Sequence, residues 1–215
     1  MSETIKQDRL RLYLIRHGEV GGAGEGRLLG RTDTPLSDRG ISQAHQLAEE
    51  LSLRRLTAVY ASDLQRASIT AEIIAQRCNL PVERNTVWRE INMGDWEGRT
   101  LAELHQEDPE PVAQLFDDPA SFQYPGGESF ASFIKRVQTG LDRLRQTHPT
   151  GDIALVAHGG VCRTIIGGVL GMPARNWLRL TQAYGCLNVI EWYGASPVLI
   201  TLNCQSKVAE SGAMV

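Results

Sequence analysis

The sequence lacks the cysteine spacing of a zinc site or of a disulfide framework. Its four cysteines are scattered along the chain and stand at Cys78, Cys162, Cys186 and Cys204. A zinc site needs closely paired ligands, and three of the four cysteines lie in apolar stretches, where a free thiol behaves as a small hydrophobic side chain. We therefore expect reduced structural thiols and a cytoplasmic protein.

Long apolar runs and an excess of basic residues are also missing. No run approaches the roughly 20 residues that a membrane helix needs, and residues 1–8 contain no apolar core of the kind found in a signal peptide. The formal net charge of −3 disfavours a nucleic-acid surface, which is normally basic. These absences exclude membrane and nucleic-acid partners and favour a small molecule as the binding partner.

At 215 residues the chain is long enough for one α/β domain. A domain of this size buries roughly 70% of its unfolded surface, so it needs no disulfide or metal for stability. We expect a single domain over residues 1–215, with frayed tails at residues 1–8 and 205–215. The sequence leaves open whether the protein is a monomer or a homodimer.

Apolar runs and helical spacings alternate along the chain. The predicted strands are Leu10–Ile15, Ala58–Ala61, Pro81–Val87, Asp152–Ala157, Cys186–Trp192 and Pro197–Leu202. The predicted helices are Ser37–Leu51, Asp63–Arg77, Ser129–Gln146 and Gly159–Leu170, with short helices or irregular structure over Thr100–Pro125. Alternation of this kind predicts a three-layer α/β/α fold with a mostly parallel central sheet.

Two of the predicted strands are followed within two residues by a histidine. Arg16 and His17 follow the first strand, and His158 and Gly159 follow the strand that ends at Ala157. In an open α/β sheet, ligands bind just beyond the carboxyl ends of the strands. The two histidines therefore predict one shared site, which we interpret as a phosphate pocket with a histidine nucleophile.

The residue types around these histidines suit phosphoryl transfer. Positive neighbours such as Arg16 disfavour protonation of His17 and keep its imidazole nucleophilic. The planar guanidinium of Arg16 matches two phosphate oxygens at once. His158 stands at a strand-to-helix junction, where helix N-terminal amides, including that of Gly159, can bind an anion.

Two further residues complete the predicted site. Arg66, one turn into the second helix, can reach over the strand ends toward the same crevice. Glu90 is the candidate acid, because enclosure between aromatic residues and a facing dianion should make it hold a proton tightly. The alternative acids are Asp95, Glu97 and Glu103.

Other motifs are weaker. The loop over Gly21–Gly26 lacks the ends of a P-loop or Rossmann motif, and we interpret it as a loop near the pocket, with Arg27 or Arg31 as possible substrate contacts. A serine-hydrolase elbow at Gly127–Ala131 lacks the preceding strand. The remaining histidines are His45, His105 and His148. We expect them on exposed faces and not grouped as the ligands of a metal ion. Since the arginines and His158 are expected to supply positive charge, we expect neither a metal nor a cofactor.

Taken together, these motifs resemble the histidine phosphatase superfamily, which contains cofactor-dependent phosphoglycerate mutase. The segments that carry the resemblance are Leu12–Glu19, Gly30–Ser37, Ser62–Ala67, Glu90 with Gly94–Gly98, and Val156–Gly160. The resemblance implies that His17 becomes phosphorylated and that Glu90 donates the proton. It also implies phosphate binding by Arg16, Arg66 and His158, and a phosphoglycerate mutase-like fold.

Within that superfamily the chain looks similar to the small phosphatases, especially α-ribazole phosphatases of cobalamin synthesis. The similarity rests on Gly94–Glu97, Gln106–Asp108 and Tyr124–Ser129. Mutases follow their acid with a tyrosine and a basic insertion, whereas Ile91, Asn92 and Met93 follow Glu90 here. We therefore expect a metal-independent phosphomonoesterase acting on a small phosphorylated metabolite.

Alternatives remain open at this point. The substrate could be α-ribazole 5′-phosphate, a phosphosugar or a phosphoglycerate derivative, and a phosphoglycerate-type mutase is a further alternative. Val20 and Ala23 stand where the family usually has a polar residue and an asparagine, and both changes remove possible phosphate contacts. These departures are the support for a rival hypothesis, a weakly catalytic protein that binds phosphorylated ligands as a regulator.

Overall fold

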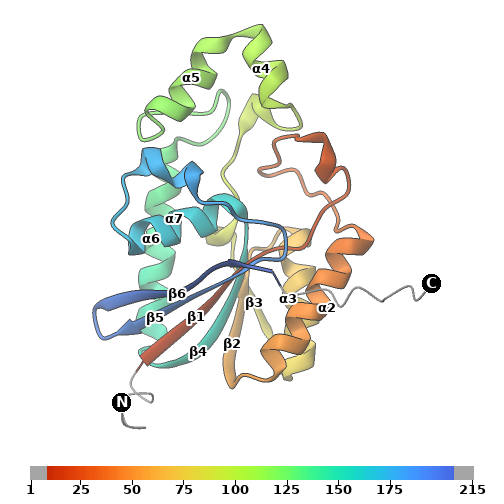
Figure 1. Cartoon of the computed structure of the whole chain (residues 1–215), viewed down its shortest axis with the longest axis vertical. Coiled ribbons are helices and arrows are strands. Elements are labelled where there is room, and N and C mark those ends of the chain that lie inside the picture. Colours follow the sequence, from red (N-terminus) through yellow and green to blue (C-terminus); the bar gives the residue numbers. More distant parts are fainter. Residues whose placement is uncertain (1–8, 206–215) are drawn as a thin grey trace, which may run out of the picture.

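β1 (Arg9–Arg16) lies inside a six-stranded sheet whose order is β3-β2-β4-β1-β5-β6 (Figure 1). The other strands are β2 (Leu56–Ala61), β3 (Val82–Arg84), β4 (Gly151–Ala157), β5 (Leu187–Tyr193) and β6 (Ser196–Cys204). Strands β1 to β4 run parallel to one another, whereas β5 and β6 are antiparallel to their neighbours. This computed structural model describes residues 9–205, so the expected tails lie outside the described residues apart from Gln205.

Helices cover both faces of the sheet. One face carries α2 (Asp38–Ser52) and α3 (Gln65–Cys78), and the other carries α6 (Phe130–Thr147) and α7 (Gly159–Val169) (Figure 1). The expected three-layer α/β/α fold with a mostly parallel sheet is confirmed. Short 3-10 helices are η1 (Ala23–Glu25), η2 (Thr86–Trp88), η3 (Gly94–Trp96) and η4 (Ala174–Arg179).

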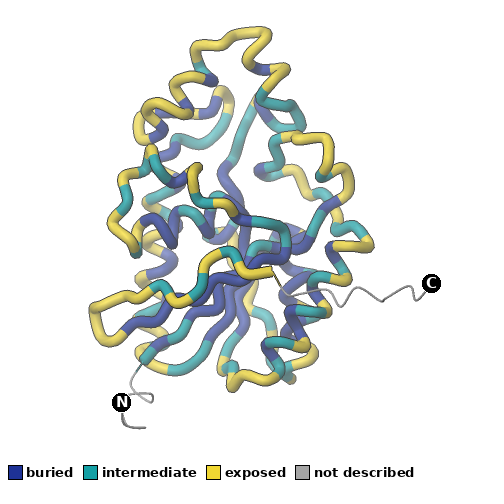
Figure 2. Tube along the Cα trace, in the orientation of Figure 1, coloured by how far each residue is buried: buried dark blue, intermediate teal, exposed yellow. Residues whose placement is uncertain are grey.

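The central strand supplies both hydrophobic cores. Side chains alternate across a strand, so Leu12 and Leu14 pack under α6 and α7 while Tyr13 and Ile15 pack under α2 and α3. All four side chains are buried, and the tube of Figure 2 is dark blue along the middle of the sheet. Burial on both faces explains why this strand is a nearly continuous apolar run in the sequence.

The segment Thr100–Pro125, which contains four prolines, forms helices away from the sheet. It contains α4 (Leu101–Glu107) and α5 (Pro109–Asp117), which lie at the top of Figure 1. Thr100 and Glu103 form a capping box at the start of α4, and Asp108 caps α5 ahead of Pro109. The choice left open for this region, between short helices and irregular structure, is thus decided in favour of helices.

The predicted elements are present, with ends displaced by a few residues. The largest difference concerns Pro81–Val87, expected to be extended throughout, where only Val82–Arg84 forms a strand before the chain turns into η2. The side chain of Asn85 accepts a hydrogen bond from Val87 N at 2.9 Å and so caps this turn. That local cap ends the strand.

Ser37 is the N-cap of α2, as predicted, and its removal tests the local stability of this region. Its Oγ accepts a hydrogen bond from Gly40 N at 3.1 Å and donates one to Glu19 Oε1 at 3.1 Å. We expect Ser37→Ala to lower the free energy of unfolding by about 1 kcal/mol, measured by urea denaturation. Ser42→Ala, at an exposed position of the same helix, is the control and should cost clearly less; equal losses would contradict the capping role.

Candidate active site

The parallel pairing of β1 with β4 brings the two predicted histidines together. In the register of these strands Arg16 is opposite Ala157, so His17 and His158 are the residues that directly follow the two adjacent strands. His17 N donates to Ala157 O at 3.0 Å, and the centroids of the two imidazole rings are 5.1 Å apart. The structure therefore places these two histidines side by side, where the sequence predicts one shared site.

A backbone contact orients the His17 ring. Its Nδ1 lies 2.7 Å from the carbonyl oxygen of Gly18. Because a carbonyl oxygen can only accept, Nδ1 carries the hydrogen in this contact. In the neutral ring the lone pair is then on Nε2, which is the arrangement that a nucleophilic imidazole requires.

Burial is the main reason why His17 is neutral. The residue is only 4% exposed. Burial lowers its pKa well below the ordinary value of 6.5, and the positive charges of Arg16 and Arg66 lower it further. The positive neighbours expected from the sequence do act in that direction, but loss of solvation is the larger effect.

His158 corrects one expectation about charge. Burial, followed by the charge of Arg66, lowers the pKa of His158 well below 6.5, so its imidazole is neutral and does not supply the positive charge expected from the sequence. Neither ring nitrogen has a hydrogen-bond partner among the described residues, although both are buried. Buried polar atoms normally have partners, so this ring has hydrogen-bonding capacity suited to a ligand.

The two arginines of the site are held by backbone carbonyls rather than by carboxylates. Arg16 Nη1 donates to Gln182 O at 2.5 Å, and the two terminal nitrogens of Arg66 donate to Thr32 O and Gly30 O, each at 2.7 Å. Arg66 is 1% exposed, which also lowers its pKa. A carbonyl fixes a guanidinium without neutralising it, so the positive charge of both arginines remains available to an anion.

Glu97 is one of the alternative acids, and it has another role. Its carboxylate accepts from the backbone N–H groups of Gly30, Arg31 and Thr32 and from the Thr32 hydroxyl, at 2.6–3.3 Å. These bonds lower its pKa despite the opposing effect of burial. Glu97 therefore shapes the loop whose carbonyls hold Arg66.

The other two alternatives are also unsuited to the role of acid. Asp95 is exposed, and Glu103 is occupied in the capping box of α4. Of the four candidates Glu90 is the one that is buried, at 6% exposure, and it contacts Gly160, two residues after His158.

Glu90 lies against the first turn of α7. Its Oε2 accepts from Gly160 N at 2.7 Å, and its Oε1 accepts from Ile91 N at 2.9 Å. A Cβ added at Gly160 would lie 2.3 Å from Glu90 Oε1, so only glycine leaves room for the carboxyl group. The amide of Gly160 thus binds Glu90, and the adjacent Gly159 lies beside Arg16, with a Cβ position 3.5 Å from Arg16 Nε.

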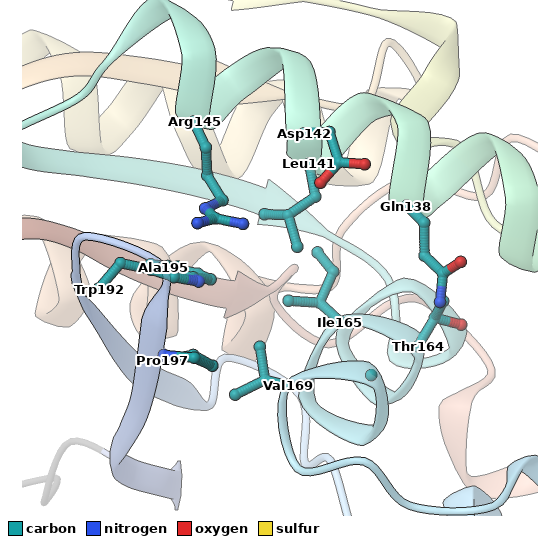
Figure 3. Close-up of a pocket in the computed structure, with 11 residues that line it drawn as sticks. Gln138, Leu141, Asp142, Arg145, Thr164, Ile165, Val169, Trp192, Ala195 and Pro197 are labelled. Carbon is teal, nitrogen blue, oxygen red and sulfur yellow. The ribbon is translucent and has the colours of Figure 1, made fainter.

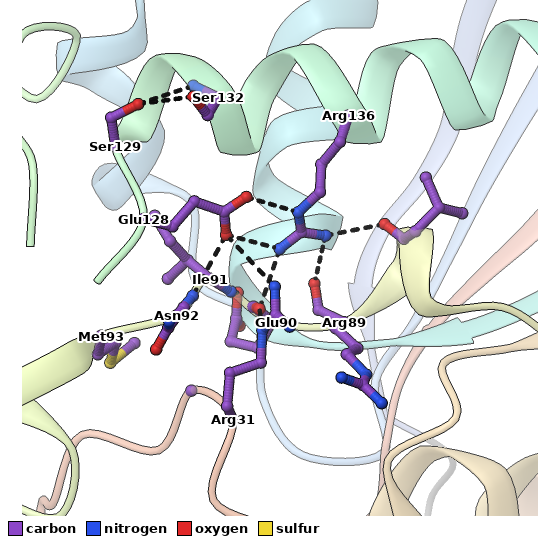
Figure 4. A network of polar contacts seen from close by, with 12 residues as sticks. Arg31, Arg89, Glu90, Ile91, Asn92, Met93, Glu128, Ser129, Ser132 and Arg136 are labelled. Carbon is purple, nitrogen blue, oxygen red and sulfur yellow. Dashed lines mark hydrogen bonds and ion pairs between the residues drawn. The ribbon is translucent and has the colours of Figure 1, made fainter. Parts of the chain in front are cut away.

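A network behind Glu90 fixes its backbone (Figure 4). Arg136, on α6, donates to the carbonyls of Val87, Arg89 and Glu90 at 2.7–3.0 Å. Its guanidinium also binds the carboxylate of Glu128 at 2.7 and 2.9 Å. This network accounts for the Gly-Glu-Ser segment of the sequence: Glu128 orients Arg136, and Ser129 caps α6.

Other residues noted in the sequence have structural contacts. Arg27 is exposed and donates to Glu25 and to Gly98 O, whereas Arg31 donates to Glu90 O at 3.0 Å and so lies at the site. Val20 is buried at 1% exposure. His148 was expected to be exposed, but it is half-buried because its Nε2 lies 2.7 Å from the Tyr60 hydroxyl.

Three observations bear on ligands other than phosphate. Within residues 9–205, no three histidine, cysteine, aspartate or glutamate side chains are grouped so that they could hold a metal ion. None of the helices in the described part of the chain is long and apolar enough to cross a membrane. A cavity of about 250 Å³ lies between α6, α7 and the β5–β6 hairpin, but none of the predicted site residues lines it (Figure 3).

Two residues that the sequence did not mark lie beside Arg16 and Gly159. The centroid of the Tyr184 ring lies 3.7 Å from the Cζ atom of Arg16 and 5.5 Å from the centroid of the His17 ring. Arg163, one turn into α7, donates to Leu180 O at 2.8 Å and lies near Gly159. The segment before β5 carries no recognisable motif, so nothing in the sequence marks Tyr184.

The comparisons with known proteins agree with this geometry. The family model of the histidine phosphatase superfamily (branch 1) matches residues 12–205. The chain belongs to the histidine phosphatase superfamily. Among its curated relatives in this superfamily is the probable phosphoglycerate mutase GpmB of Yersinia pestis (strain Pestoides F), which is 33% identical over 190 residues, 88% of each chain.

Solved structures of the superfamily have the same fold. A putative α-ribazole-5′-P phosphatase from Escherichia coli K-12 MG1655 is 33% identical, with a TM-score of 0.84 over 94% of this chain and 99% of that one. Mycobacterial glucosyl-3-phosphoglycerate phosphatase is 29% identical, with a TM-score of 0.82 over 92% of this chain and 100% of that one. These structures have the phosphoglycerate mutase-like fold that the sequence resemblance implied.

The depressed pKa values of the two histidines predict how stability depends on pH. Below pH 6.5 these two histidines bind protons in the unfolded chain, whereas in the folded protein burial keeps them neutral. Their contribution to the free energy of unfolding is therefore fully present above pH 6.5 and is lost as the pH falls. Each histidine should lower the free energy of unfolding by about 1.4 kcal/mol per pH unit in that range. Urea denaturation at pH 7.5, 6.5 and 5.5 measures this slope.

The matched variants are His17→Asn and His158→Asn, each of which should reduce the slope below pH 6.5. His45→Asn removes an exposed histidine and should leave it unchanged. An unaltered slope in both buried-site variants would show that these rings are not neutral in the folded protein.

Proposed function

We propose that the protein is a phosphomonoesterase that hydrolyses a small phosphorylated metabolite through a phosphohistidine on His17. The observation that carries the proposal is the His17 ring itself, buried, neutral and held through Nδ1 so that Nε2 is the nucleophilic nitrogen. Membership of the histidine phosphatase superfamily supports the same chemistry.

Arg16, Arg66, His158 and Gly159 form the proposed phosphate-binding set. Arg16 and Arg66 meet the phosphoryl oxygens with guanidinium groups that form no salt bridge within residues 9–205, and His158 offers a buried ring N–H. Donors fixed before the substrate arrives stabilise the transition state without having to reorganise. Gly159 lets the start of α7 approach the anion, because it has no Cβ.

The proposed reaction has two steps. First, Nε2 of His17 attacks phosphorus, the bond to the leaving oxygen breaks, and Glu90 gives its proton to that oxygen. In the second step Glu90 takes a proton from water, the water oxygen attacks phosphorus, and phosphate leaves as the His17 ring is regenerated. Glu90 is suited to this role because Gly160 N and Ile91 N hold its two oxygens in place.

The proposed substrate class is a small phosphate monoester, with α-ribazole 5′-phosphate as the first candidate. Support comes from the E. coli structure described as a putative α-ribazole-5′-P phosphatase. Glucosyl-3-phosphoglycerate is a second candidate, supported by the mycobacterial structure. Ranking kcat/KM over a panel of phosphometabolites that contains both compounds decides between them.

A mutase is the alternative suggested by the name of the Yersinia relative. A mutase must also hold the second phosphate of its substrate, which calls for additional cations. The segment directly after Glu90 offers none, because Ile91, Asn92 and Met93 are uncharged. Interconversion of 3- and 2-phosphoglycerate faster than phosphate release would favour the mutase.

His17→Ala tests the nucleophile. We expect it to lower turnover of p-nitrophenyl phosphate by roughly 10³-fold or more, because no other group replaces the attacking nitrogen. Rapid quenching of the wild-type enzyme with labelled phosphate ester should place the label on His17, located by mass spectrometry. Label on a different residue, or full activity in His17→Ala, would overturn the mechanism, and His45→Asn is the control.

Glu90→Gln tests the acid. A general acid contributes roughly 10²- to 10⁴-fold, and more for a poor leaving group than for a good one. We expect a larger loss of kcat with glycerol phosphate than with p-nitrophenyl phosphate. Gly160→Ala should act similarly by displacing Glu90, whereas Gly168→Ala, where the nearest atom lies 3.6 Å from the added Cβ, should retain activity. Equal losses for both substrates would remove Glu90 from the acid role.

A further inference from the structure

The segment from Leu180 to Cys186, between η4 and β5, lies against the phosphate-binding set although it belongs to none of the motifs. Its Gln182 carbonyl accepts from Arg16 Nη1 at 2.5 Å, and its Gly185 N donates to His17 O at 2.9 Å. The ring of Tyr184 stacks on the Arg16 guanidinium, with Cζ 3.7 Å from the ring centroid. One short segment therefore holds both residues of the Arg-His pair.

These contacts leave one edge of Arg16 available for an anion. Nη1 is taken by the Gln182 carbonyl and one face of the guanidinium is covered by Tyr184. Nε is buried and has no hydrogen-bond partner among the described residues. Nε and Nη2 form the side-on fork of a guanidinium, which can bind two phosphoryl oxygens together.

Asn203, near the end of β6, holds the segment in place. It has a left-handed backbone, with φ of 52°. Its Oδ1 accepts from Ala183 N at 2.7 Å, and its own N donates to Asn188 Oδ1 at 2.8 Å. Asparagine is one of the few residues other than glycine that adopts this conformation readily.

Two buried amides complete the connection to the central strand. Asn188 Nδ2 donates to Gln182 Oε1 at 2.8 Å and to Leu14 O at 3.1 Å. Gln182 Nε2 donates to Asn188 Oδ1 at 3.1 Å. A buried polar network whose members are bonded to one another is rigid, so the position of Ala183 is transmitted to the Gln182 carbonyl and the Tyr184 ring.

We propose that Tyr184 and Asn203 are positioning residues for Arg16, and so determine how tightly the phosphoryl group is bound. Tyr184 acts directly, by stacking on the guanidinium, and Asn203 acts through Ala183. The proposal rests on the proposed function, in which Arg16 binds the phosphoryl group. Neither residue takes part in bond making or breaking, so the effect belongs to binding more than to the chemical step.

Four variants test the two residues in matched pairs. Tyr184→Leu removes the stacking ring and Tyr184→Phe keeps it. Asn203→Gly permits the left-handed backbone but removes the acceptor of Ala183 N, whereas Asn203→Asp keeps that acceptor. Asn79→Gly is the control, because Asn79 is an exposed residue with φ of 55° at the end of α3, far from this segment.

We measure kcat and KM with p-nitrophenyl phosphate and the dissociation constant of inorganic phosphate by calorimetry. Loss of a cation–π contact or of one hydrogen bond weakens binding by about fivefold. Tyr184→Leu and Asn203→Gly should each weaken phosphate binding and raise KM by about fivefold, with a smaller change in kcat. The Phe, Asp and Asn79→Gly variants should stay within about twofold of the wild type.

Phosphate binding within twofold of the wild type in both Tyr184→Leu and Asn203→Gly would overturn the proposal, as would losses confined to kcat. If Asn203→Gly does not fold, Tyr184→Leu decides the outcome. The phosphate titration also separates this proposal from the proposed function. A wild-type protein that binds phosphate but is never phosphorylated on His17 refutes the function alone, whereas one that binds no phosphate refutes the positioning role.

Discussion

The parallel pairing of β1 with β4 is the constraint on which the site depends. It aligns Arg16 with Ala157, and the residue after each is a histidine, so two imidazoles 141 positions apart in the chain lie with ring centroids 5.1 Å apart. Both strands are buried on both faces, which fixes their register, because a shift by one residue would exchange the side chains of the two cores. The hydrophobic cores therefore define the distance between His17 and His158.

Around this pair of histidines the arginines make two different kinds of contact. Arg16 and Arg66 donate to backbone carbonyls, so their charge is not neutralised, whereas Arg136 is paired with Glu128 and acts as a backbone brace. The nearby carboxylate of Glu97 is directed at backbone N–H groups. Charges inside a buried site interact more strongly than charges in water, so this separation leaves a net positive field beside the two histidines, as the proposed function requires.

Much of the site could be predicted because its signals are local. His17 and His158 each end an apolar run, and Ser37 caps the next helix, so short windows of sequence contain the information. The charge state of His158 could not be predicted, because it depends on how deeply the ring is buried. The contacts that hold Glu90 also escaped prediction, since Gly160 and Arg136 reach it from other parts of the chain.

By itself the sequence determined the alternation of strands and helices, the residue types of the site and the family to which the chain belongs. It could do so because apolar periodicity, helix caps and strand-end motifs depend on neighbours along the chain. Only the tertiary structure decided which edge of Arg16 is left without a hydrogen-bond partner among the described residues and which of the four candidate acids is buried. Those outcomes depend on contacts such as that of Arg16 with Gln182, 166 residues away, and such contacts form only when the sheet has assembled.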